Sequence, residues 1–134
     1  MDGGSIYSQY IKPSWTPPSW VIGLVWPLLY VIIAVSFSTV FYSAYKKQIS
    51  WVIALPFALN LILNFAFTYI QFGLANNFLA SIDILLIVVT LIWALLAVWL
   101  KAPELRWVSY ANIPYLVWGI YATTVQLGIT YLNR

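Results

Sequence analysis

Apolar residues fill four long stretches of the chain, and short polar segments separate them. The stretches cover about residues 19–45, 50–72, 77–100 and 107–132. Each is long enough to form a helix across a bilayer core of about 30 Å, which needs about 20 residues. Because the connecting turns are short, consecutive helices must run antiparallel. The pattern predicts an all-α integral membrane protein with four antiparallel transmembrane helices in a single membrane domain, residues 1–134.

The composition supports this class. Hydrophobic residues make up 63% of the chain and charged residues only 7%, which leaves too little polar surface to cover a soluble globule. The net charge of +3 is not clustered, so nucleic acid is not expected as a partner. The polar N-terminus has no basic region ahead of an apolar core, and we therefore expect no cleavable signal peptide.

Two residue types are absent, because the chain contains neither histidine nor cysteine. Zinc and iron–sulfur centres held by protein ligands are excluded, and so are nucleophilic triads built on histidine. No acid–base constellation stands out either. We expect no metal site, no catalytic residue and no cofactor beyond a bound ligand.

Basic residues are distributed unevenly between the two ends of the predicted bundle. The turns at 46–50 and 101–106 carry four cations and one glutamate, whereas the other end carries Lys12 and Arg134. Under the positive-inside rule the two turns face the cytoplasm and both termini face out.

Aromatic residues and prolines gather between Lys12 and Tyr30. At 100° per residue a helix places Gly23 and Tyr30 on one line, and Trp20 and Trp26 flank that line. An aromatic belt at the membrane interface explains tryptophans near the surface such as Trp20. The deeper Trp26 and Tyr30 favour a notch for a flat ligand.

Amides and a carboxylate interrupt the second and third stretches. Asn60, Asn64, Phe67 and Gln71 share one helix face, which interhelical hydrogen bonding and ligand contact explain equally well. Asp83 lies about 9 Å along the third helix at 1.5 Å per residue. We expect a polar clamp between Asp83 and Lys12, with Arg134 or a tryptophan indole as other donors within reach, and proton or ligand handling as the alternative role.

The fourth stretch combines aromatic and small residues. Tyr115, Trp118 and Ala122 share a face with Tyr121 beside it, and Pro114 is expected to bend the helix.

Three motifs in this order resemble one family. They are PSWTPPSWVIGLVWPLLY at Pro13–Tyr30, LNFAFTYIQFG followed by ASID at Leu63–Asp83, and IPYLVWGIYAT at Ile113–Thr123. The sequence is similar over nearly its whole length to the translocator protein family, also called tryptophan-rich sensory proteins. The resemblance implies a five-helix membrane bundle, often dimeric, that binds porphyrins, sterols and synthetic ligands in a pocket closed by the loop before the second helix.

The four stretches correspond to helices two to five of that family, so residues 1–18 are expected to act as a lid. The family's first helix has no counterpart, and a second copy in a homodimer, another partner or the lipid bilayer would take its place. Smaller departures from the family pattern are Ile22, Phe67 and Gln126, where the family usually has Phe, Trp and Asn.

The resemblance also carries the family's ligand pocket onto positions of this chain. These are Trp20, Gly23, Trp26, Tyr30, Asn64, Phe67, Trp118, Tyr121 and Ala122. They fall on the helix faces described above, although periodicity alone does not show that these faces converge.

These observations predict a membrane binding protein for a flat hydrophobic ligand such as a porphyrin, another tetrapyrrole or a sterol, acting as sensor, carrier or scavenger. One alternative is a light-dependent porphyrin-degrading enzyme, for which the resemblance implicates Trp26 and Trp118. The other is a structural membrane subunit without a ligand. The resemblance implies a prokaryotic cell membrane, or the mitochondrial outer membrane if the source is eukaryotic.

Overall fold

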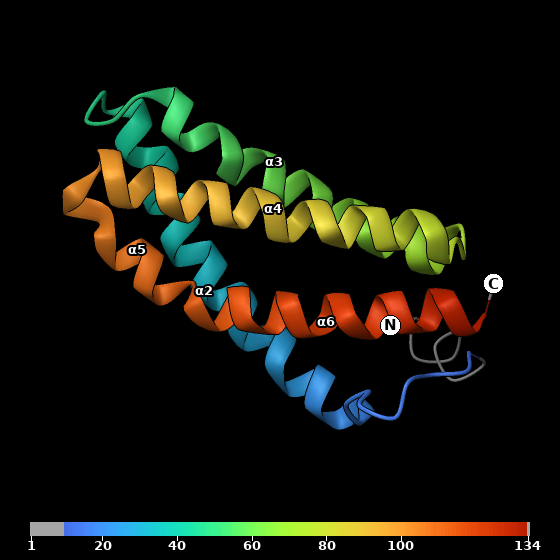
Figure 1. Ribbon diagram of the computed structural model, residues 1–134. Helices are drawn as coiled ribbons and strands as arrows, with labels where there is room; N and C mark the ends of the chain where they lie inside the picture. Colours follow the sequence, from blue (N-terminus) through green and yellow to red (C-terminus); the bar gives the residue numbers. More distant parts are fainter. Residues whose placement is uncertain (1–9, 134) are drawn as a thin grey trace.

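The computed structural model describes residues 10–133, and helices are its only regular secondary structure over this range. In chain order the elements are α2 (Ser19–Tyr45), α3 (Trp51–Thr68), the π-helix η1 (Tyr69–Gly73), α4 (Asn77–Lys101), the 3-10 helix η2 (Pro103–Leu105), α5 (Arg106–Ala111) and α6 (Ile113–Leu132) (Figure 1). The predicted all-α fold is confirmed.

Three of these segments are long and apolar enough to cross a membrane: Trp20–Tyr45, Trp51–Gln71 and Asn77–Lys101. The fourth expected span is less apolar and is divided into α5 and α6. The helix α6 contains 20 residues, which is the length that a bilayer core requires. The chain is an all-α membrane protein.

The helix α4 lies between α3 and α6 and runs antiparallel to both (Figure 1). The helix α2 crosses this layer at an angle, and its N-terminal half diverges from it (Figure 1). Along α2, Phe37, Val40 and Ala44 are buried, whereas Leu24 and Leu28 are exposed. The C-terminal half of α2 therefore packs closely with the bundle, while the N-terminal half is more exposed and contacts the core through residues such as Leu29 and Trp26.

The apolar core fills the space between the C-terminal half of α2 and the other helices. Phe37 and Phe57 meet edge to face with ring centroids 4.8 Å apart, and Leu91, Val98 and Val108 are fully buried around the same core. Lipid tails are as apolar as these side chains, so close packing rather than transfer from water stabilises this contact.

Two helix boundaries differ from those expected. The α-helical part of the second stretch ends at Thr68, and the chain continues as a π-helix to Gly73. In the fourth stretch the chain breaks at Asn112 rather than bending within a continuous helix at Pro114. Proline lacks an N–H and its ring clashes with the preceding turn, so the helix restarts just before it. The Asn112 amide then donates to the carbonyl of Val108 at 2.8 Å and to the Ser36 hydroxyl at 2.9 Å.

Candidate functional site

Four aromatic side chains from α2 and α6 form a continuous set of ring contacts. The ring centroids of Trp26 and Tyr30 are 5.6 Å apart, those of Trp26 and Trp118 are 6.4 Å apart, and those of Trp118 and Tyr121 are 5.6 Å apart. We call these four residues the aromatic cluster. Offset and edge-to-face arrangements at such distances are the favourable ones for aromatic pairs.

The indole nitrogen of Trp118 is buried, and no acceptor among the described residues receives its N–H. A buried donor without a partner costs about 1–3 kcal/mol, and tryptophan normally satisfies its N–H when it is buried. This donor is therefore free to bind an acceptor on a ligand that enters the cluster.

A buried hydrogen-bond network joins α3, α4 and α6 beside the cluster. The Asn60 amide donates to the Ile87 carbonyl at 2.9 Å and to the Thr90 hydroxyl at 3.1 Å. The Tyr115 hydroxyl donates to Oδ1 of Asn60 at 2.8 Å and accepts from the Asn64 amide at 2.6 Å. For Asn60 the structure favours the interhelical interpretation of the polar stripe, because both ends of its amide are occupied.

The segment before α2 lies along α6 and is held there at three points. The backbone of Ile11 and the side chain of Asn133 exchange hydrogen bonds of 3.1 and 2.8 Å. Pro13 packs on Gly128, where a Cβ atom would lie only 2.4 Å from the proline Cγ. Tyr121 donates to the backbone carbonyl of Trp15. Residues 11–15 thus connect directly to the aromatic cluster. Residues 1–9 of the expected lid lie outside the described part of the chain, and the lid role stays a prediction.

The remaining predicted pocket residues lie at different depths. Trp20 is 72% exposed, and a Cβ atom built on Gly23 would meet nothing within 4 Å. These two residues do not join the aromatic cluster. Phe67 is partly buried and packs against the apolar core, and Ala122 is also partly buried.

Asp83 is 5% exposed, and no donor in the described part of the chain reaches its Oδ2 atom. The clamp between Asp83 and Lys12 stays a prediction. A carboxylate buried in this way requires a positive charge or hydrogen-bond donors nearby. Substitutions at and around Asp83 can therefore identify its partner.

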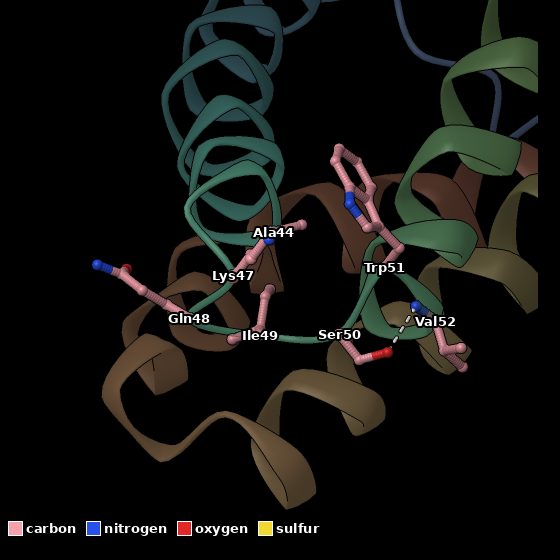
Figure 2. A pocket seen from close by; sticks show the side chains of 7 residues that line it. All are labelled: Ala44, Lys47, Gln48, Ile49, Ser50, Trp51 and Val52. Atoms are coloured by element: carbon pink, nitrogen blue, oxygen red, sulfur yellow. Dashed lines mark hydrogen bonds between the residues drawn. The ribbon is translucent and has the colours of Figure 1, made fainter.

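A hollow of about 530 Å³ lies away from the aromatic cluster, in the turn that joins α2 to α3 (Figure 2). Its lining consists of Ala44, Lys47, Gln48, Ile49, Ser50, Trp51 and Val52. None of the predicted pocket residues lines it. At the aromatic cluster the rings contact one another, so a flat ligand enters only if Trp26 and Trp118 separate.

Sequence reasoning missed three features of this region. Tyr115 was placed on the correct face of the last helix, but its role as the link between Asn60 and Asn64 depends on how far α6 lies from α3. The Trp15 carbonyl carries no sequence signal at all. Gly128 did have one, since a glycine in an apolar helix permits close approach of another segment.

The fold and the site define an all-α membrane protein whose tryptophan-rich helices converge on a buried indole donor. The chain belongs to the TspO/MBR family, whose model matches residues 2–132. It is 36% identical over 128 residues to the tryptophan-rich protein TspO of Bacillus cereus, which covers 95% of this chain and 80% of that relative. It is 33% identical over 129 residues to the translocator protein of Homo sapiens, which covers 84% of this chain and 72% of that relative. The family resemblance is thereby confirmed.

Proposed function

We propose that the aromatic cluster binds a flat hydrophobic ligand within the membrane, such as a porphyrin, another tetrapyrrole or a sterol, and that the protein acts as its sensor, carrier or scavenger. The observation that carries this proposal is the buried and unpaired N–H of Trp118 inside a set of four rings.

Ring stacking supplies the apolar part of recognition. Indole and phenol faces stack on a planar macrocycle, and an aromatic pair contributes about 0.5–1.5 kcal/mol beyond the area that it buries. The Trp118 N–H would donate to a polar edge of the ligand, which removes the cost of leaving this donor unpaired.

The position of α2 supports a route by which the ligand reaches the aromatic cluster. Trp26 and Tyr30 lie on the N-terminal half of α2, where Leu24 and Leu28 are exposed. Trp26 packs against the edge of the apolar core, so a movement of this half that opens the cluster would also shift contacts at that edge. The uneven distribution of cations supports an orientation with both termini outside the cell.

Titration with protoporphyrin IX tests the proposal, with the porphyrin absorption band as the readout because it does not depend on protein tryptophans. We expect a Trp26→Phe, Trp118→Phe double variant to bind about tenfold more weakly or worse. Trp93→Phe is the matched control, since Trp93 is 43% exposed on α4 and lies outside the cluster. An affinity that the double variant leaves unchanged would count against the site.

A further inference from the structure

A second concave site lies between α4 and α5, separate from the aromatic cluster. It is a groove of about 320 Å³ lined by Leu95, Leu96, Trp99, Ser109, Tyr110 and Ile113. The volume is at the lower end of the range for ligand clefts, and five of the six lining residues are apolar or aromatic. Such a lining suits a hydrocarbon chain.

The groove spans the break at Asn112, since Ser109 and Tyr110 lie on α5 and Ile113 lies at the start of α6. The Ser109 hydroxyl donates to the Leu95 carbonyl at 2.9 Å and holds α5 against α4. Serine is small, so the floor of the groove stays open. Trp99 and Tyr110 meet edge to face at 5.3 Å and form one wall.

A guanidinium is fixed against that wall. Nε of Arg106 donates to the Trp99 carbonyl at 2.9 Å, and the guanidinium carbon lies 4.7 Å from the centre of the Trp99 ring. The bond uses only Nε, and within residues 10–133 the structure gives the Nη groups no hydrogen bond. Both Nη groups are therefore available to an anion, and the stacking reduces the rotamer entropy lost when the anion binds.

If α4 spans the bilayer, as its length and apolar composition indicate, the groove lies near one membrane interface. Leu95 precedes Lys101 by six residues, so the groove extends about 9 Å from the end of α4 at 1.5 Å per residue. The same end of the molecule carries an excess of cations, Lys46, Lys47, Lys101 and Arg106, against Glu104. Trp99 and Tyr110 are of the type that is enriched where a bilayer meets water.

We propose that this groove binds one anionic phospholipid, with an upper acyl-chain segment against Leu95 and Leu96 and the phosphate paired with Arg106. An arginine pairs with phosphate through two parallel N–H bonds, and one cation near an anionic lipid surface contributes about 1 kcal/mol. The site does not depend on the function proposed for the aromatic cluster.

Native mass spectrometry of the full chain, released from detergent with equal amounts of phosphatidylglycerol and phosphatidylcholine of the same acyl chains, tests this assignment. We expect the protein to retain phosphatidylglycerol in preference to phosphatidylcholine. Arg106→Ala should lower that retention about fivefold, which corresponds to about 1 kcal/mol. Lys47→Ala is the matched control, because it removes the same charge from the other turn at this end, and it should retain the lipid like the unmodified chain.

Leu96→Trp provides an independent variant should Arg106→Ala fail to fold. Leu96 is 54% exposed, so a larger side chain is tolerated there, and the indole would fill the groove. We expect this variant to lose phosphatidylglycerol as well. Equal retention of the two lipids by the unmodified chain would overturn the proposal, and so would undiminished retention in either variant or an equal loss in Lys47→Ala.

Discussion

The indole rings of Trp26 and Trp118 meet at 89° with their centroids 6.4 Å apart. They join the diverging half of α2 to α6, although α2 packs mainly against α3 and α5. Both rings also pack against the apolar core, so a flat ligand that separates them would displace contacts at the edge of that core.

Tyr115 is the residue through which three helices share hydrogen bonds. Tyr115→Phe removes the hydroxyl and leaves Oδ1 of Asn60 without its donor and the Asn64 amide without its acceptor. We expect a loss of about 1–2 kcal/mol in the free energy of unfolding, measured by titration with a denaturing detergent. Tyr45→Phe, at an exposed position near the end of α2, should change it little. Equal stabilities of the two variants would refute the role assigned to the network.

Gly128 allows the N-terminal segment to lie on α6. In Gly128→Ala the new Cβ would lie 2.4 Å from the ring of the buried Pro13, so the segment must move away. The Ile11 N–H, which donates to Asn133, should then exchange with solvent about three- to tenfold faster. Gly23→Ala is the control, because a Cβ there meets nothing within 4 Å. Unaltered exchange in Gly128→Ala would show that Pro13 does not rest on this glycine.

A double-mutant cycle tests the predicted clamp between Asp83 and Lys12. If the two side chains interact, Asp83→Asn and Lys12→Gln should have non-additive effects on the free energy of unfolding, with a coupling of about 0.5–3 kcal/mol. The buried carboxylate supplies the physical reason, since an uncompensated charge there is costly. If the two substitutions have additive effects on the free energy of unfolding, Asp83 has another partner or another role.

The absence of histidine and cysteine leads to a prediction about porphyrin chemistry. Once binding has reached equilibrium, incubation of the protein with protoporphyrin IX in the dark should cause no further loss of the porphyrin absorption band with time, because the chain lacks histidine and cysteine, the residues most often used for acid–base and metal-assisted catalysis. Loss of the band under illumination, present in the unmodified chain and absent from the Trp26→Phe, Trp118→Phe double variant, would favour the photochemical alternative over simple binding.

Helical periodicity predicted which faces of α2 and α6 carry the residues of the aromatic cluster. It did not predict that these two faces contact each other. Trp26 with Tyr30 on α2, and Trp118 with Tyr121 on α6, follow from a rotation of 100° per residue. Their approach depends on the crossing of α2 over the bundle, which no local pattern encodes. The family resemblance supplied this information instead. It also included Trp20 and Gly23, which the diverging half of α2 leaves outside the cluster.

Local irregularities were the least predictable features. Pro114 indicated a bend, yet the break falls at Asn112 because the asparagine amide bonds to the last turn of α5 and to Ser36. The π-helix after Thr68 has no marker residue in the sequence. Contacts of the N-terminal segment with α6 join residues more than 100 positions apart, and such pairing follows only from the tertiary fold.

Nitrogen-15 NMR of the indole N–H groups, with Trp118 assigned by its loss in Trp118→Phe, tests the central claim most directly. We predict that protoporphyrin IX shifts the Trp118 resonance downfield as its buried N–H gains an acceptor, that the Trp26 resonance moves as well, and that the Trp93 resonance stays in place. A Trp118 resonance that remains unchanged at saturating porphyrin would contradict the proposed site.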